Sequence, residues 1–279
     1  MTSEGRALVL GGGGVTGVAW EIGLMYGLAE RGIDLSKADL FVGTSAGSVV
    51  AAQITGGETL QQLYDHELVD TTGDRNATIG TSVLLRFVFA AAYPGERRRG
   101  RAWLGRAALA KKTVPESERR TAIMSRVPHD DWPATPLRIP AIVAETGEVT
   151  VFDKDSGVSL IDAVAASCAV PLVWPPMTVN GTRYIDGGMR SAANVDLAAG
   201  YGRVVVIAPI TAALRHADKP AVQAAGLGPT VRTAVVAPTD AALTAIGRNP
   251  LDPDRRAAAA EAGRKQAAQV ADRVGAAWS

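Results

Sequence analysis

The chain opens with blocks of apolar residues separated by glycine-rich turns. Ala7-Leu8-Val9-Leu10 predicts a buried strand, and the apolar spacing after the next four glycines predicts a helix over about 15–30. A second apolar block, Leu40-Phe41-Val42, runs into Gly43-Thr44-Ser45-Ala46-Gly47, and a helix is expected over 46–54. The N-terminal part of the chain therefore predicts two consecutive strand–helix units.

The middle of the chain has a mainly helical pattern. We expect helices over about 58–127, interrupted at Thr72-Gly73-Asp74, at Pro94-Gly95 and at Pro115. Strand character returns at 137–144 and 148–152. The helical region is therefore interpreted as an insertion within an α/β core.

Turn and cap signals organise the next part of the chain. Thr146-Gly147 predicts the turn between the two strands just named, and Ser159 predicts the N-cap of a helix that stops before Pro171. Val179-Asn180-Gly181-Thr182 predicts a β-hairpin, because an Asn-Gly pair accepts the positive φ angles of a type I′ turn. The returning strand, 183–185, then leads directly into Asp186.

The β-branched run over 203–207 is typical of a strand buried on both faces, so we expect a largely parallel sheet in an α/β fold. Near Val195 to Ala199 we expect a short helix. Asp252-Pro253-Asp254 begins an alanine-rich helix reaching about 275, within a helical C-terminal segment of about 239–275. No linker divides the chain, which predicts one domain over 1–279.

Composition narrows the classes of function. The chain has 279 residues, a net charge of +1, one cysteine and three histidines without zinc-ligand spacing. These features argue against a nucleic-acid partner, a disulfide framework and a structural metal. The N-terminus lacks a secretory signal, and the apolar segment 81–93 is shorter than a membrane span, so we expect a cytoplasmic protein.

Three separated motifs are candidates for chemistry. The first, Gly12-Gly13-Gly14-Val15-Thr16-Gly17, matches a dinucleotide fingerprint but could equally direct amides toward an oxyanion. The acidic residue that a dinucleotide site expects after the second strand is replaced by Ser45, flanked by Gly43 and Gly47. This flanking favours a nucleophile elbow over a simple helix N-cap. The third motif is Asp186-Gly187-Gly188, whose alternative interpretation is an ordinary turn.

Two arrangements could supply the base that activates Ser45. The order Ser45, Asp186, His216 is that of a Ser-Asp-His triad in α/β-hydrolases, which would make the protein a soluble esterase or thioesterase. However, the elbow follows only the second predicted strand, and His216 lies in a polar loop. The other candidate is a Ser45–Asp186 dyad, in which the carboxylate accepts the serine proton directly.

Together the motifs resemble the patatin-like phospholipases, serine lipid acyl hydrolases with a Ser-Asp dyad. The resemblance covers about 6–208 and includes Ala166-Ser167-Cys168-Ala169-Val170-Pro171 before the aspartate motif. It implies a three-layer α/β/α fold, Ser45 as nucleophile, Asp186 as base and oxyanion donors near Gly13 and Gly14, with no cofactor or metal. Thr16 departs from the family, which commonly has arginine or lysine at this position.

The resemblance also implies a lipid or phospholipid ester as substrate. A low-activity lipid-binding regulatory protein is a further alternative. The apolar segment 81–93 and the neighbouring Arg97-Arg98-Arg99 and Arg101 raise the hypothesis of transient contact with a membrane surface. The competing interpretation is a core helix beside a solvated charged loop.

Overall fold

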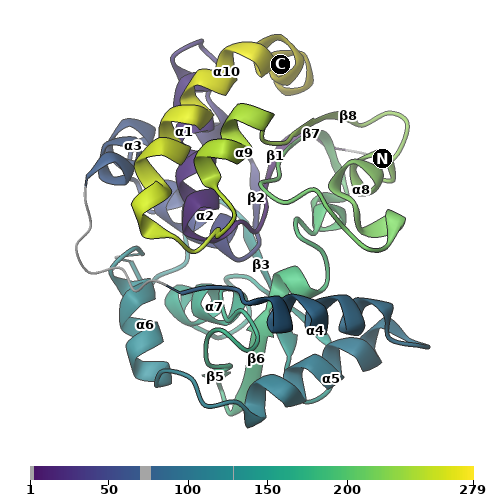
Figure 1. The fold of residues 1–279 in the computed structure, drawn as a ribbon. Helices are drawn as coiled ribbons and strands as arrows, with labels where there is room; N and C mark the ends of the chain where they lie inside the picture. The colour runs from purple at the N-terminus through teal and green to yellow at the C-terminus, as the bar shows by residue number, and fades with distance from the viewer. Residues whose placement is uncertain (1–2, 70–76, 128) are drawn as a thin grey trace.

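The computed structural model describes residues 3–69, 77–127 and 129–279 (Figure 1). In these residues an eight-stranded sheet has the order β5-β6-β3-β2-β1-β7-β8, and β4 pairs with β3 off this path. The strands are β1 (Ser3–Leu10), β2 (Leu40–Gly43), β3 (Leu137–Val143), β4 (Val149–Phe152), β5 (Met177–Val179), β6 (Thr182–Asp186), β7 (Tyr201–Ile207) and β8 (Arg232–Val236).

The sheet is parallel through its centre and antiparallel at one side. β1 pairs in parallel with β2 and β7, β2 with β3, and β7 with β8. The pairs β3–β4, β3–β6 and β5–β6 are antiparallel. The expectation of a mixed α/β fold with a mainly parallel sheet is therefore confirmed.

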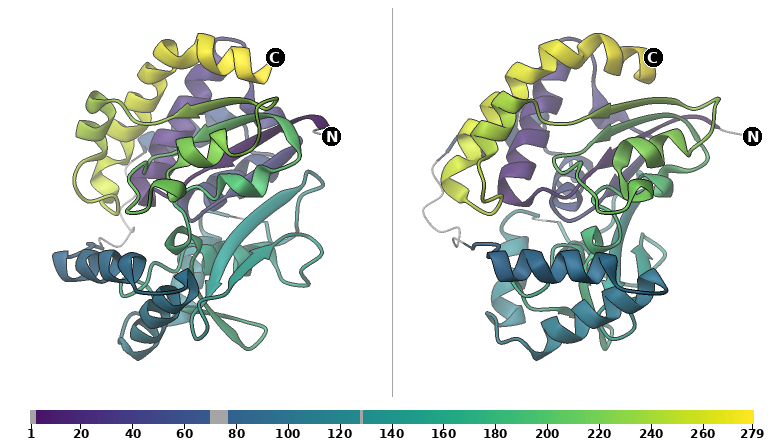
Figure 2. Two further views of the ribbon diagram at one scale, coloured as in Figure 1. Left: turned by 90° about the vertical axis from the view of Figure 1, so that its right-hand side faces the viewer. Right: turned by 45° about the vertical axis from the view of Figure 1, so that its right-hand side comes forward.

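Helices cover the sheet, and Figures 1 and 2 show α1, α9 and α10 lying together against one side of it. α4 and α5 lie at the opposite end of the molecule, near α7 and the β5–β6 hairpin. The α-helices are α1 (Gly14–Ala29), α2 (Ala46–Thr55), α3 (Leu60–Leu68), α4 (Thr81–Ala92), α5 (Arg97–Ala110), α6 (Glu116–Met124), α7 (Leu160–Ser167), α8 (Pro220–Ala225), α9 (Asp240–Ile246) and α10 (Arg256–Trp278).

Alternating side chains of β1 show why both faces of the sheet are covered. Leu8 and Leu10 belong to the large core formed with α1, α2, α7 and α10. Ala7 and Val9 point to a second core on the other face, which includes Ala224 of α8. Side chains of one strand therefore enter two apolar layers, as expected of a three-layer α/β/α arrangement.

Most local expectations agree with the structure. Asn180 and Gly181 have φ angles of 48° and 77° between β5 and β6, and the Ser159 side chain caps α7. The short helix expected near 195–199 is the 3-10 helix η3 (Val195–Ala198). The predicted helical region contains α3 to α6, with interruptions at 94–95 and Pro115; the interruption predicted at 72–74 lies outside the described residues.

The structure adds elements that the apolar pattern did not predict. α8 occupies the segment that is only weakly patterned, and β8 extends the sheet beyond β7. The long C-terminal helix begins at Arg256, after a short 3-10 turn at the predicted Pro253 start, and ends at Trp278. Assignment of the whole chain to one domain stays a prediction. No helix in the described segments is long and apolar enough to cross a membrane.

Candidate active site

Ser45 lies in a tight turn between β2 and α2. Its φ of 50° and ψ of −117° are unusual for a residue with a side chain, and its hydroxyl makes no capping hydrogen bond to α2. The N-cap alternative therefore lacks the hydrogen bond that defines it. This backbone geometry favours the interpretation of the turn as a nucleophile elbow.

Close packing explains the two glycines that flank the serine. A Cβ added to Gly43 would lie 2.6 Å from the Cα of Ser48, and one added to Gly47 would lie 2.2 Å from the carbonyl oxygen of Leu10. Neither position can hold a side chain without moving backbone. Gly43 and Gly47 thus allow β1, β2 and α2 to approach closely enough to form the turn.

The turn brings Ser45 to Asp186, which ends β6. Ser45 Oγ donates a 2.7 Å hydrogen bond to Asp186 Oδ2, and the Gly188 amide donates a 2.7 Å bond to Asp186 Oδ1. A Cβ on Gly187 would lie 2.2 Å from the carbonyl oxygen of Pro140, so this loop packs closely against β3. The structure therefore brings the predicted serine and aspartate motifs together.

Burial raises the pKa of the Asp186 carboxyl. The side chain is buried, and loss of water raises its pKa to about 6, although the hydrogen bonds from Ser45 and Gly188 and the charge of Arg119 act in the opposite direction. A carboxylate with this pKa is ionised at neutral pH and is a stronger base than an exposed aspartate.

The segment 166–171 supports both residues of the pair. Ser167 Oγ accepts a 3.0 Å hydrogen bond from the Ser45 amide, and the Ala169 carbonyl accepts a 3.0 Å bond from the Asp186 amide. Cys168, between them, is buried, and this burial raises the pKa of its thiol to about 11. The resemblance singled out this segment, but the sequence analysis assigned none of its residues a supporting role.

Asn194 is a second supporting residue, and the sequence analysis missed it. It has a φ of 51° and is fully buried. Its Nδ2 donates to Thr44 Oγ1 at 3.0 Å and to the Ser191 carbonyl at 2.8 Å, while Arg190 donates to its Oδ1 at 2.7 Å. Asn194 therefore links the residue before Ser45 to the loop after Asp186. The sequence signal that could have identified Asn194 is its place as a polar residue shortly after the Asp-Gly-Gly motif.

The backbone amides of the glycine loop differ in whether they already donate a hydrogen bond within the protein. The Gly12 amide donates to the Ala192 carbonyl at 2.7 Å and the Gly17 amide to the Gly13 carbonyl at 3.0 Å, so both are already engaged. For the Gly13 and Gly14 amides, which lie at the start of α1, the described part of the chain shows no hydrogen bond outside the helix. These two are the amides suited to bind an anion.

Thr16 has a role different from that of a basic side chain. It is fully buried, and both its amide and its hydroxyl donate to the Pro250 carbonyl, at 3.2 Å and 3.3 Å. It thereby attaches the glycine loop to the segment before α10. A cation whose charge does act on Asp186 is Arg119 of α6, which the sequence analysis did not identify.

His216, the alternative base, lies in the 3-10 helix η4 (His216–Asp218), beyond β7. Both oxygens of Asp186 accept hydrogen bonds from Ser45 and Gly188, and across the described residues no hydrogen bond joins His216 to either Ser45 or Asp186. The geometry favours a direct serine–aspartate pair over a triad through His216.

Three similar solved structures share little sequence with this chain. VipD from Legionella pneumophila has 15% identity and a TM-score of 0.48, over 97% of this chain and 67% of VipD. The type III effector protein ExoU has 14% identity and a TM-score of 0.41, over 99% of this chain and 54% of ExoU. ExoU from Pseudomonas aeruginosa in complex with SpcU has 13% identity and a TM-score of 0.41, over 99% of this chain and 53% of that chain.

The chain thus spans about two thirds of VipD and about half of ExoU. A search of curated proteins found no match. A family model described as patatin-like phospholipase matches residues 8–199, a range that contains the glycine loop, Ser45 and Asp186. Because this match extends over well more than half of the sequence, the chain belongs to the patatin-like phospholipase family, whose name implies action on lipid esters.

Proposed function

We propose that this protein is a serine lipid acyl hydrolase that cleaves carboxylic esters of phospholipids or lysophospholipids through an acyl-Ser45 intermediate. The observation that carries the proposal is the 2.7 Å hydrogen bond from Ser45 Oγ to Asp186 Oδ2. A nucleophile and a base must lie within this range for proton transfer. The family match supports a lipid as the source of the ester.

Acylation begins when Asp186 accepts the Ser45 proton and Oγ attacks the ester carbonyl. The carbonyl π bond opens, and its electron pair forms an oxyanion on the tetrahedral intermediate. When the intermediate collapses, the bond to the leaving alkoxide breaks and Asp186 returns the proton to it. The products are an alcohol and acyl-Ser45.

Deacylation uses the same carboxylate with water as nucleophile. Asp186 takes a proton from water, the resulting hydroxide attacks the acyl carbonyl, and the second tetrahedral intermediate expels Ser45 Oγ. The proton held by Asp186 returns to Ser45, and the fatty acid leaves. Asp186 therefore ends the cycle in its initial ionised state.

The amides of Gly13 and Gly14 are the proposed oxyanion donors. They lie at the N-terminus of α1, where the helix dipole favours negative charge. Gly14 has a φ of 63°, and a Cβ there would lie 2.4 Å from the Pro250 carbonyl oxygen. A glycine is therefore needed for the loop to keep this shape beside the serine.

Substitutions test the dyad against the alternatives. We expect Asp186→Asn to lower p-nitrophenyl ester hydrolysis by about 10²–10⁴-fold and His216→Ala to leave it unchanged. Ser45→Ala should reduce hydrolysis to the background rate. A large loss of hydrolysis in His216→Ala, with little loss in Asp186→Asn, would contradict the dyad and support a base at His216 instead.

The regulatory alternative requires a separate measurement. A fluorophosphonate probe should label Ser45 in the folded wild type, as located by peptide mass spectrometry, and should leave Ser45→Ala unlabelled. Failure to label Ser45 in protein that still binds lipid would favour a low-activity binding protein. An untargeted lipid-hydrolysis profile of wild type against Ser45→Ala then identifies the class of ester consumed.

A further inference from the structure

α4 is apolar on two opposite faces, and only one of them is covered. Val83 lies in a small core with Leu104 and Leu172, and Phe87 packs against this core. On the other side the exposed fractions of Leu84, Leu85, Val88 and Phe89 are 50%, 64%, 46% and 49%. A surface helix normally presents polar residues to water, so this exposed apolar stripe marks an interaction surface.

Positive charge is concentrated in the same region. Between residues 81 and 112 the chain carries eight lysine and arginine residues and one acidic residue, although its net charge is only +1. Arg97 pairs with Asp218, and Arg98 pairs with Glu148 between two exposed side chains. Burial and the neighbouring charges of Arg190 and Arg97 lower the pKa of Arg101, so cations crowd one another here.

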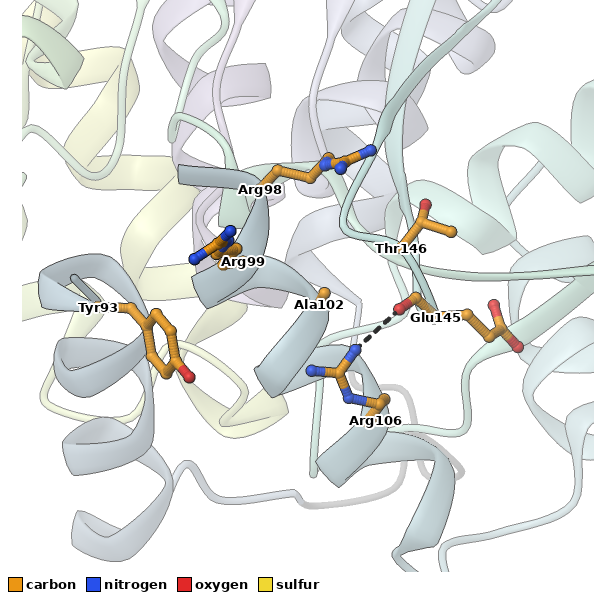
Figure 3. Close-up of a pocket in the computed structure, with 7 residues that line it drawn as sticks. All are labelled: Tyr93, Arg98, Arg99, Ala102, Arg106, Glu145 and Thr146. Carbon is orange, nitrogen blue, oxygen red and sulfur yellow. Dashed lines mark hydrogen bonds between the residues drawn. The ribbon is translucent and has the colours of Figure 1, made fainter. Parts of the chain in front are cut away.

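Three of these arginines border a surface cavity of about 450 Å³ beside α5, together with Tyr93, Glu145 and Thr146. Figure 3 shows Arg98, Arg99 and Arg106 on α5, with Glu145 and Thr146 beside this helix in the turn after β3. Arg106 donates to the Glu145 carbonyl at 3.2 Å, and the Glu145 carboxylate points away from it. Among the described residues, the Arg99 guanidinium makes no hydrogen bond or ion pair.

Aromatic contacts join the arginine cavity to the apolar stripe. Phe89 of α4 lies 5.6 Å from Tyr93 and 4.8 Å from Trp103 of α5, measured between ring centroids. Arg99 and Arg106 precede and follow Trp103 by four and three positions, so they share its face of the helix. The apolar and basic groups therefore form one continuous patch, which we call the α4–α5 surface.

We propose that the α4–α5 surface docks on an anionic lipid bilayer, with the exposed apolar stripe of α4 entering the interface and the guanidinium groups of Arg99 and Arg106 binding lipid phosphates. Exposed apolar side chains beside basic residues match a membrane whose surface is negatively charged. A second copy of this chain would bring like charges together, which disfavours that occupant. The choice of a lipid as the partner rests on the proposed function. The apolar and basic character of the surface is observed independently of that function.

Vesicle flotation of the Ser45→Ala protein tests this docking, because the lipids stay intact. Vesicles of phosphatidylcholine alone are compared with vesicles in which part of it is replaced by phosphatidylglycerol. We expect tighter binding to the anionic vesicles and a loss of binding at high salt. Replacing both Arg99 and Arg106 by Ala should lower the partition coefficient about 30-fold. Replacing both Leu85 and Phe89 by Ser should lower it by about tenfold or more.

Matched controls lie on other helices. Arg273→Ala and Leu243→Ser remove an exposed cation and an exposed apolar side chain from α10 and α9, and we expect neither to change binding. Circular dichroism and thermal unfolding establish that every variant is folded. Failure to bind either vesicle, equal binding to both, or equal losses in the control variants would overturn the proposal.

Two further outcomes separate this inference from its alternatives. If sedimentation shows a dimer that the Leu85 and Phe89 replacements dissociate, the occupant is a second copy and the membrane proposal is wrong. Binding to vesicles does not require the nucleophile, so failed flotation leaves the dyad proposal intact. Conversely, unchanged ester hydrolysis by Ser45→Ala would refute the dyad without affecting the docking result.

Discussion

Ser45 and Asp186 are separated by 141 positions in the chain, and Ser45 Oγ donates a 2.7 Å hydrogen bond to Asp186 Oδ2. Ser45 lies in the turn that follows β2 and Asp186 ends β6, and β3 lies between these two strands in the sheet. The hydroxyl thus reaches a buried carboxylate directly, without an imidazole between them. The pKa of this carboxylate, and with it the base strength that the proposed mechanism needs, depends on its burial.

The pH dependence of hydrolysis should report that burial. Because the pKa of Asp186 is raised to about 6, we expect kcat/KM to rise about tenfold per pH unit below this value and to level off above it. The rate should rise with pH because, in the proposed mechanism, Asp186 must be ionised in the free enzyme to accept the Ser45 proton. Initial rates on a soluble ester from pH 4 to 9, with product read at one quenching pH, measure the profile. A midpoint near the ordinary aspartate value would indicate a hydrated carboxyl.

Local signals in the sequence predicted much of the fold. Asn180-Gly181 predicted the β5–β6 hairpin and Ser159 the start of α7, because each depends on contacts within a few residues. β8 was missed. This strand is short and lies at the edge of the sheet, and its first residues are exposed. Its sequence therefore lacks the continuous apolar run that identified β7.

The candidate site was predictable where a motif imposes local geometry. Gly43 and Gly47 indicate a close backbone approach, and the structure contains it. The partners Ser167, Asn194 and Arg119 could not be predicted in the same way. The Asn194–Thr44 contact, for example, spans 150 positions and exists only once the strands have assembled. Sequence periodicity carries no information about such a pair.

Asn194 should act as a positioning residue for the pair. Asn194→Gly keeps the positive φ of 51° but removes the Nδ2 bond to Thr44. We expect kcat on a soluble ester to fall about tenfold or more with a smaller change in KM, because a small displacement of the nucleophile is costly. Asn180→Gly is the matched control, since Asn180 has a φ of 48° in an exposed hairpin. Equal kcat values for the two variants would contradict this role.

Gly47 should be required for stability. A Cβ at this position would lie 2.2 Å from the Leu10 carbonyl oxygen, so Gly47→Ala is expected to lower the free energy of unfolding by ~3 kcal/mol. Gly275→Ala is the comparison within α10, where the new Cβ would lie 3.4 Å from Ile33. That substitution should raise stability by up to ~1 kcal/mol through helix propensity. Urea unfolding measures both; a stable Gly47→Ala protein would show that the elbow can relax.

Glu21 is a buried carboxyl whose removal should stabilise the protein. It lies fully buried in α1, and neither carboxylate oxygen has a hydrogen-bond partner within the described residues. Burial raises its pKa well above the usual value, and the nearby Gly11 amide opposes this only in part. The native state therefore holds the Glu21 proton more tightly than the unfolded chain does.

The sign of the pH effect follows from this difference in proton binding. Below the unfolded pKa near 4.5 the side chain is neutral in both states, and Glu21→Gln should change stability little. As pH rises toward the folded pKa, the wild type loses about 1.4 kcal/mol per pH unit that the glutamine variant keeps. The variant should therefore have the higher Tm at pH 7.5, with a smaller difference at pH 4. Glu261→Gln, whose side chain is 55% exposed, should show no such trend. A glutamine variant less stable than wild type at pH 7.5 would mean that the Glu21 carboxylate has a partner in the native protein.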